Sequence, residues 1–472
     1  MFFSNTPSPA ALRALEGTAR SVYWLDRPER PAATPELVGS EQADLVVVGG
    51  GFTGLWTALL AKQADPERSV LLVEGGRIAE GATGRNGGFV SASLTHGFGN
   101  GLDRWPDDMP ALLRLGHENL DAIEATIAHF GIECDFLRSG ELDVAVEPHQ
   151  LAGISAAAEE ARPFGEDLRL LSADDVRARV DSPSFLGGLL DPKGVALVDP
   201  ARLAWGLRRA CIDSGVIVRE RTPVTRIEQR EDHMVLTTRR GSIRAHRLAL
   251  ATNAYPPLLK RLQHYVVPVY DYVLMTEPLT DRQWSGIGWS GREGVSDAGN
   301  QFHYYRTTDD GRILWGGYDA VYHRGNGFGP RFEHSQESYE RLAGHFLQTF
   351  PSLDGIRFSH AWGGAIDTCS RFSAFWGTAN DGMTAYVAGY TGLGVGASRF
   401  GAATMLDLLD GRPTVRTELE MVRTKPVPFP PEPMRSWAIG LTTSSIRRAD
   451  ENEGRRDIWL RTLDRLGLGF DS

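Results

Sequence analysis

The sequence predicts an α/β (α+β) fold, in which a domain of alternating strands and helices carries an inserted, mostly antiparallel β-sheet domain. Three observations lead to this prediction. Strand, glycine-rich turn and helix alternate over residues 44–74, and the same pattern returns over 385–411. The residues between them are richer in short strands. The chain has 472 residues, which exceeds the roughly 250–300 residues that one hydrophobic core holds.

Helices are predicted at three places before the strand-rich middle. Apolar residues at helical spacing predict a helix over 108–130, and an alanine-rich stretch predicts another over 151–161. A third helix begins at Pro200, after the N-cap Asp199, and ends at Gly215.

Alternating apolar and polar residues predict strands within 222–252, 267–279 and 302–317, and a helix follows over 335–350. After Arg412 the chain becomes Pro-rich and ends in a charged helical segment, for which a solvated helix, a lid and an oligomer contact are all open. The predicted organisation has an N-terminal surface extension at 1–39, a first domain from 40–105, 185–262 and 362–415, a second domain from 106–184 and 263–361, and a C-terminal helical tail at 416–472.

Composition excludes several classes of protein. The net charge of −10 argues against nucleic acid or an anionic membrane as a partner, because both require a basic surface. No apolar run approaches the roughly 20 residues of a membrane span, and we expect no signal peptide. Cys134, Cys211 and Cys369 form no paired motif, so we expect no disulfide framework, no metal site and a cytoplasmic location.

Gly49, Gly51 and Gly54 form a G-x-G-x-x-G motif that follows an apolar strand and opens a helix, which predicts a Rossmann-like dinucleotide site. Gly49 permits the tight turn, Gly51 lets a pyrophosphate approach the backbone, and Gly54 lets helix and strand pack closely. The helix N-terminus carries partial positive charge that suits phosphate. Glu74 ends the next strand and can accept hydrogen bonds from ribose hydroxyls.

The motif alone leaves NAD and FAD open. A second glycine motif followed by an acid-terminated strand is not found, so one dinucleotide is expected. The loop 75–88 is rich in glycine and contains two arginines, which favours a long ligand that continues past its pyrophosphate; a flexible surface loop is the alternative.

Several segments in this order resemble one family. They are "VVVGGGFTGLWTALLAKQ", "VLLVEGGRIAEGATGRNGG", "ALATNAY", "PVYDYVLMTEPL", "YYRTTDDGRILWGG", "HAWGGAID" and "VAGYTGLGVG". Together they are similar to the FAD-dependent amine and amino-acid oxidoreductases of the D-amino-acid oxidase/glycine oxidase superfamily, and most similar to its gamma-glutamylputrescine oxidase-like branch. The resemblance covers roughly residues 40–415 and implies an FAD-binding domain with an inserted substrate domain.

The resemblance implies which residues contact FAD. Relatives often carry His where this chain has Leu393, so a contact there is expected from the backbone. The position at which some members attach FAD covalently matches about Ala365, and Cys369 lies four residues later, so FAD is expected to bind non-covalently. The implied cofactor residues are Gly49, Gly51, Phe52, Thr53, Gly54, Glu74, Gly75, Arg77, Ala82, Thr83, Arg85, Asn86, Gly87, Gly88, Val224, Ala251, Gly392, Leu393, Gly394 and Val395.

The implied reaction is hydride transfer from the carbon of a C–N bond to flavin N5, hydrolysis of the imine, and reoxidation by oxygen to give hydrogen peroxide. Arg306 matches a strand position that holds a substrate carboxylate, although an ion pair with a neighbouring aspartate is the alternative. Asp367 stands where glycine oxidase-like proteins often have a second arginine, which favours an amine, or a substrate with a distal amine, over a simple α-amino acid. The other candidates for the substrate pocket are Tyr270, Tyr272, His303, Tyr305 and Tyr390.

Three alternatives stay open: a flavin dehydrogenase with an acceptor other than oxygen, a flavoprotein with structural FAD, and an NAD enzyme, against which the loops around Gly84 and Gly392 speak.

Overall fold

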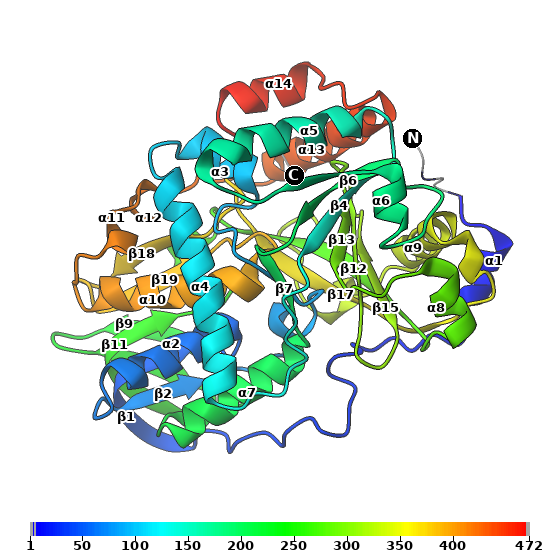
Figure 1. Ribbon diagram of the computed structural model, residues 1–472. Helices are drawn as coiled ribbons and strands as arrows, with labels where there is room; N and C mark the ends of the chain where they lie inside the picture. Colours follow the sequence, from blue (N-terminus) through cyan, green and yellow to red (C-terminus); the bar gives the residue numbers. More distant parts are fainter. Residues whose placement is uncertain (1–2, 4–5, 469–472) are drawn as a thin grey trace.

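The computed structural model describes residue 3 and residues 6–468. The first of its two large sheets has eight strands (Figure 1). Five strands pair in parallel, and β18, β9 and β10 extend the sheet antiparallel. The apolar run Leu45–Val48 is buried, as expected of a strand covered on both faces. The strands are β1 (Gly39–Val48), β2 (Val70–Val73), β8 (Ile217–Arg219), β9 (Val224–Gln229), β10 (Met234–Thr238), β11 (Gly241–Leu250), β18 (Phe375–Ala379) and β19 (Thr384–Ala388).

Four helices pack together beside this sheet: α2 (Phe52–Ala64), α4 (Met109–His129), α7 (Pro200–Asp213) and α10 (Gly394–Leu409). The predicted cap of α7 is confirmed, because the side chain of Asp199 accepts the N–H of Arg202 at 3.0 Å. Gly215, just beyond the helix, has a φ of +87°.

The second sheet has nine strands, and all of its pairings are antiparallel except that between β13 and β4. Its aromatic-rich core lies under α9 (Gln336–Thr349), and α8 (Asp281–Ile287) and α1 (Pro9–Ala14) lie at the same side (Figure 1). The strands are β4 (Glu141–Ala145), β5 (Arg169–Ser172), β6 (Gly187–Asp191), β12 (Val267–Thr276), β13 (Gly294–Asp297), β14 (His303–Thr307), β15 (Ile313–Gly317), β16 (Val321–Tyr322) and β17 (Phe358–Thr368).

The two sheets differ from the predicted segments at two strands. β6 and β17 both belong to the second sheet, whereas the sequence assigned 185–262 and 362–415 to the first domain. An apolar strand at a domain junction can pair with either sheet, so its sequence does not specify its partner. A short ribbon of β3 (Phe89–Ser91) and β7 (Val195–Leu197) links the two parts of the chain.

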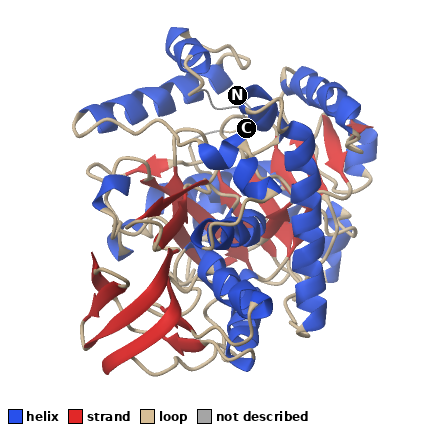
Figure 2. Cartoon of the chain, turned by 90° about the vertical axis from the view of Figure 1, so that its left-hand side faces the viewer, coloured by secondary structure: helices blue, strands red, loops and turns tan. Residues whose placement is uncertain are grey.

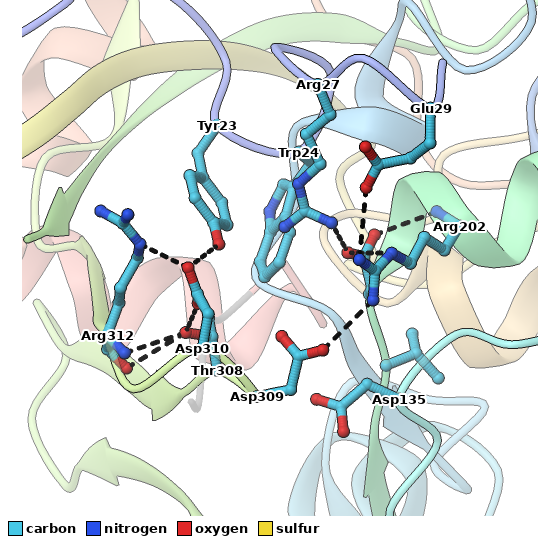
Figure 3. A network of polar contacts seen from close by, with 12 residues as sticks. Tyr23, Trp24, Arg27, Glu29, Asp135, Arg202, Thr308, Asp309, Asp310 and Arg312 are labelled. Carbon is cyan, nitrogen blue, oxygen red and sulfur yellow. Dashed lines mark hydrogen bonds and ion pairs between the residues drawn. The ribbon is translucent and has the colours of Figure 1, made fainter. Parts of the chain in front are cut away.

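The N-terminal extension is not confined to the surface, which corrects the expectation for residues 1–39. Trp24 is only 1% exposed, and its indole N–H donates to the carbonyl of Asn86 at 2.9 Å. Figure 3 shows the neighbouring contacts: the hydroxyl of Tyr23 reaches Asp310 at 2.8 Å, and Arg202 reaches Glu29 and Asp309. Aromatic side chains in a segment without regular structure are buried here because they pack behind the glycine-rich loop.

The C-terminal tail forms α11 (Val415–Glu418), α12 (Glu420–Arg423), α13 (Met434–Glu451) and α14 (Ile458–Arg465). In Figure 1, α13 and α14 lie at the top beside α5 (Gln150–Ala161), near α3 (Phe98–Arg104) and α6 (Ala173–Arg177). Figure 2 shows from a second direction that helices cover the top of the molecule and that the strands lie below them. Among the described residues, no helix combines the length and the apolar character needed to cross a bilayer.

Candidate functional site

A large cavity begins at the turn after β1 and runs between the two sheets to α5 and the C-terminal tail. Its volume is about 1910 Å³. A typical ligand pocket measures about 300–1,000 Å³, so this cavity has room for a large cofactor and a second molecule.

The glycine turn at the start of the cavity leaves no space for side chains. Gly49 has a φ of +115°, and a Cβ there would lie 2.3 Å from the carbonyl oxygen of Ala251. A Cβ on Gly54 would lie 1.8 Å from the carbonyl oxygen of Gly49. Gly51, the N-cap of α2, has no side chain that could cap the helix, and its backbone lines the cavity at the helix start. Such a turn matches an anionic group such as a pyrophosphate.

Glu74 lies at the end of β2 and braces this turn. Its carboxylate accepts the N–H of Gly50 at 2.6 Å and the N–H of Gly76 at 2.7 Å. Burial raises the pKa of Glu74, and the two backbone N–H groups oppose that effect. The carboxylate lines the cavity, where it can accept further hydrogen bonds from hydroxyl groups.

The second glycine-rich loop is held rigidly against the first. The hydroxyl of Thr83 accepts the N–H of Phe52 at 3.0 Å, which joins the two loops. The amide of Asn86 donates to the carbonyls of Ala82 and Thr83 and accepts the N–H of Gly88 at 2.8 Å. This loop is therefore not a flexible surface segment, because its polar groups are satisfied within the site.

Eighteen of the twenty cofactor positions expected from the sequence line the cavity; Gly54 and Arg77 do not. Gly54 lies under the turn and allows its packing. The guanidinium of Arg77 donates to the carbonyl of Pro31 at 2.5 Å, outside the cavity, so the expected ligand contact is corrected to a contact with the N-terminal extension. Arg85 lines the cavity and also donates to the carbonyl of Gly363 at 3.0 Å.

The late turn before α10 reaches the same cavity from the other side. Gly392 has a φ of +96°, and the residues Gly392 to Val395 line the cavity at the start of the helix. Asp367 accepts the N–H of Gly389 at 2.7 Å, and the hydroxyl of Tyr390 accepts that of Thr53 at 2.9 Å. Asp367 and Tyr390 both line the cavity. Their hydrogen bonds connect the late turn to β17 and to the start of α2.

Arg306 lies elsewhere than the sequence predicts. It is 0% exposed and does not line the cavity. Its guanidinium donates to the carbonyl of Val198 at 2.6 Å and pairs with Asp135 at 3.5 Å. Burial lowers its pKa to about 10. This position supports the glycine-rich loop from behind, because a Cβ on Gly88 would lie 2.7 Å from the same guanidinium.

His303, Tyr305, Tyr270 and Tyr272 are also absent from the described lining of the cavity. His303 instead contacts Asp297 at 2.5 Å and His345 at 3.0 Å, inside the core of the second sheet. Successive side chains on a strand point to opposite faces, so a choice that is wrong by one residue is wrong for the whole strand. The predictions of His303, Tyr305, Tyr270 and Tyr272 as pocket residues are therefore wrong, because these side chains lie on the face of the sheet that points away from the cavity.

Asp271 on β12 and Tyr304 on β14, which were not predicted from the sequence, line the cavity instead. Both line the cavity, and the hydroxyl of Tyr304 donates to the carboxylate of Asp271 at 2.5 Å. Burial raises the pKa of Asp271 to about 7, although hydrogen bonds from Tyr304, Tyr272 and Gly317 lower it. The signal that could have found Tyr304 is Gly316, which lies opposite it in the sheet and leaves room for the ring.

The part of the cavity beyond this pair is acidic. Glu141 and Asp143 on β4 share the hydroxyl of Ser296, and burial followed by mutual repulsion raises the pKa of Glu141. Among the described residues, the guanidinium groups that line the cavity are Arg85 and Arg456, and no lysine lines it. Other carboxylates in the lining are Glu160, Glu166, Asp191, Asp271, Asp297, Asp319 and Asp450.

The C-terminal tail closes this acidic end. Trp459, Ile439 and Leu463 line the cavity from α13 and α14. Asp450 fixes α13 to the loop before β14, because its carboxylate accepts the N–H of Gln301 at 2.9 Å and the side-chain amide of Asn300 at 2.7 Å. The tail is thus part of the cavity wall and not only a solvated helix.

Replacing Asp450 with alanine is expected to loosen the packing of α13 and α14 and to leave the glycine turn at the nucleotide end of the cavity unchanged. Each hydrogen bond to a charged group contributes about 1.5–3 kcal/mol, so the free energy of local opening should fall by about that amount. Hydrogen exchange of the α13 amides measures this change, with the exposed Glu451→Ala as the matched control. Equal exchange in both variants would contradict the docking role of Asp450.

Cys369 does not resemble a site of covalent attachment. It is fully buried, its thiol donates to the carbonyl of Ser373 at 3.1 Å, and burial raises its pKa. A thiol in these surroundings is not activated as a nucleophile.

Comparisons with known proteins agree with this geometry. Residues 44–408 match the family model described as "DAO: FAD dependent oxidoreductase". The chain is 32% identical to the gamma-glutamylputrescine oxidoreductase of Escherichia coli over 83% of this chain and 89% of that protein. It is 26% identical to the probable oxidoreductase OrdL of Haemophilus influenzae over 79% of this chain and 84% of that protein. The glycine oxidase of Geobacillus kaustophilus shares the fold, with a TM-score of 0.69 and 18% identity over 81% of this chain and 99% of the other.

The residues present fit FAD. The first turn leaves no space for side chains and offers a helix N-terminus, and Glu74 stands beside it. The cavity continues along the second glycine-rich loop to the late turn, as an extended dinucleotide requires. The chain therefore belongs to the DAO family of FAD-dependent oxidoreductases.

Proposed function

We propose that the protein oxidises a C–N bond of a small amine and that it prefers amines without a carboxylate on the reacting carbon. The acidic lining at the substrate end of the cavity carries this proposal. A cationic ammonium group is favoured by that lining, whereas an α-carboxylate is repelled by it. Arg306 is not available to bind a carboxylate, because it is fully buried outside the cavity.

The relatives' names support the same class of substrate. They include a gamma-glutamylputrescine oxidoreductase, sarcosine oxidase subunits and glycine oxidases, which are named for amines or amino acids. Of these two substrate classes, amines and amino acids, the acidic lining of the cavity favours amines.

FAD, when bound, would accept a hydride at N5 from the carbon that bears the amine, after which the imine would hydrolyse in water and oxygen would be reduced to hydrogen peroxide. The turn Gly49–Gly54 would hold the pyrophosphate, with Glu74 at the ribose and Val224 at the adenine. The helix start at Gly394 would face the pyrimidine ring and favour negative charge there. Because the thiol of Cys369 is buried with a raised pKa, attachment of FAD is proposed to be non-covalent.

All three cysteines of the chain are free and buried. Unpaired thiols are usual in a reducing compartment, and we propose that the protein works in the cytoplasm.

Matched pairs of substrates test the proposal, because each pair differs only by the α-carboxylate. Putrescine is compared with ornithine and cadaverine with lysine, and hydrogen peroxide release is measured with the FAD-loaded enzyme. We expect kcat/KM for the decarboxylated member to be at least about tenfold higher, which corresponds to about 1.4 kcal/mol. A preference for the amino acid of each pair would contradict the proposal.

Electron acceptors other than oxygen are tested in the same samples. If the amines reduce the flavin under nitrogen but peroxide release in air is slow, a quinone or an artificial dye replaces oxygen in the assay. Rapid turnover with the dye alone would assign the protein as a dehydrogenase. An FAD that no amine or amino acid reduces would favour a structural flavin.

A further inference from the structure

The strands β12 and β14 bring Asp271 and Tyr304 together at the wall of the cavity. Both side chains are half-buried, and the surface that they expose lines the cavity. The O–H of Tyr304 donates to Asp271 at 2.5 Å, so the lone pairs of the phenol oxygen are left to accept a hydrogen bond from another group.

The other oxygen of Asp271 is fixed by the backbone. It accepts the N–H of Tyr272 at 2.7 Å and that of Gly317 at 3.1 Å. These contacts hold the carboxylate in one orientation, and they suit its ionised form because every partner is a donor.

The pair lies directly at the second glycine-rich loop. A Cβ on Gly87 would lie 2.8 Å from the ring of Tyr304, and Gly364 is the cross-strand partner of Asp271. This loop and the segment at Gly364 line the same cavity as the helix start at Gly394, which is proposed to face the pyrimidine ring of the flavin.

Hydride transfer needs the amine in its neutral form, because an ammonium nitrogen has no lone pair to stabilise the developing cation. A primary amine has a pKa of about 10 in water, so it arrives protonated at neutral pH. A base near the reacting nitrogen therefore allows the reaction to proceed from the protonated amine at neutral pH.

We propose that Tyr304 and Asp271 bind the substrate ammonium and remove its proton, an inference that rests on the proposed amine oxidation. The substrate N–H bond breaks as its proton moves to the phenol oxygen of Tyr304. At the same time the Tyr304 O–H bond breaks and its proton moves to Asp271. The amine is left neutral, Asp271 becomes a carboxylic acid, and no electrons change hands.

Several groups set the charge around Asp271. The pKa of about 7 that burial gives this carboxylate lies in the range that suits a general base at neutral pH. Asp319 raises the pKa further, and it is itself paired with Arg341 on α9. Across β17, Arg85 lies against Gly364 and is paired with Glu333 at 2.9 Å. The ionisable groups around Asp271 are thus its partner Tyr304, Asp319 with its ion-pair partner Arg341, and, across β17, Arg85 with its ion-pair partner Glu333.

The first test measures binding without turnover. tert-Butylamine has no hydrogen on the carbon that bears nitrogen, so it binds as an amine and cannot be oxidised. Its dissociation constant for the FAD-loaded enzyme is measured by calorimetry between pH 5.5 and 8.5. In the wild type we expect binding to weaken as pH falls through about 7, because Asp271 becomes neutral. In Asp271→Asn we expect at least about tenfold weaker binding at pH 8 and no such dependence.

The second test follows flavin reduction by an oxidised amine under nitrogen between pH 6 and 10. Asp271→Asn and Tyr304→Phe are expected to slow reduction by about 10²–10⁴-fold at pH 7. The deficit should shrink as pH approaches 10, where the amine is neutral in solution. Tyr305→Phe is the control, because this tyrosine is adjacent in sequence but lies on the opposite face of the strand, outside the cavity.

The two tests separate the possible failures. An equal loss at every pH, a wild-type pH profile in both variants, or no saturable binding of tert-butylamine to the wild type would each overturn the role of the pair. If tert-butylamine binds as expected but no amine reduces the flavin, the proposed oxidation fails while the amine site stands. If Asp271→Asn does not fold, Tyr304→Phe still decides, because Asp271 keeps both backbone donors in that variant.

Discussion

Replacing Gly54 with alanine is expected to give a protein that does not retain FAD. The new Cβ would lie 1.8 Å from the carbonyl oxygen of Gly49, a distance that no relaxed structure tolerates, so the turn must move. Overpacking of this kind typically costs about 1–3 kcal/mol. Here the displaced atom belongs to the turn that holds the pyrophosphate, so the affinity for FAD should fall at least about tenfold. The flavin absorbance of the purified protein, before and after addition of FAD, measures the effect.

Gly440→Ala is the matched control for this variant. Gly440 lies inside α13, and a Cβ there meets nothing within 4 Å. Alanine at such a site should stabilise the protein by up to about 1 kcal/mol through helix propensity. Wild-type retention of FAD by Gly54→Ala would contradict the account of the turn.

Replacing Arg306 with alanine is expected to destabilise the fold, with little effect on the Michaelis constant of the protein that remains folded. The substitution leaves the carbonyl of Val198 without its 2.6 Å donor and removes one partner of Asp135. Breaking a buried charged contact costs about 3–5 kcal/mol, so a large fall in the unfolding free energy should accompany faster loss of FAD. Urea unfolding and initial rates measure the two effects separately.

Arg306→Lys serves as the second variant, because a lysine keeps the charge but cannot reproduce the fork of contacts, and it should show an intermediate loss of stability. A normal unfolding free energy together with a Michaelis constant raised 100-fold for an amino acid would restore Arg306 as a carboxylate ligand and would contradict its placement behind the loop.

The fold was largely predictable because its signals are local. The strand before Gly49, the turn, the helix and the acid at Glu74 lie within thirty residues, and the cap at Asp199 is read from adjacent residues. Helices such as α9 carry a full amphipathic period with a cap at Ser335. These features depend on neighbours in sequence, so the sequence alone predicts them.

The substrate end was less predictable because its geometry depends on distant partners. Alternation along β14 separates Tyr304 from Tyr305, but it does not say which of them faces the cavity. Which tyrosine faces the cavity depends on the neighbouring strand β15, where Gly316 has no side chain and leaves space for the ring of Tyr304. The C-terminal tail is held at the site by Asp450, whose partners Asn300 and Gln301 lie about 150 residues earlier in the chain. A contact over this distance in sequence cannot be predicted from neighbouring residues.

The oxidation of amines by this protein is best tested by an anaerobic absorbance titration of the FAD-loaded protein with putrescine and an N-acylated derivative of putrescine. We expect at least one of these amines to bleach the visible flavin bands completely, whereas glycine and ornithine at equal concentration should do so far more slowly. A flavin that amino acids bleach and amines leave unchanged would contradict the proposed substrate class. A protein that takes up no FAD would contradict the account of the site itself.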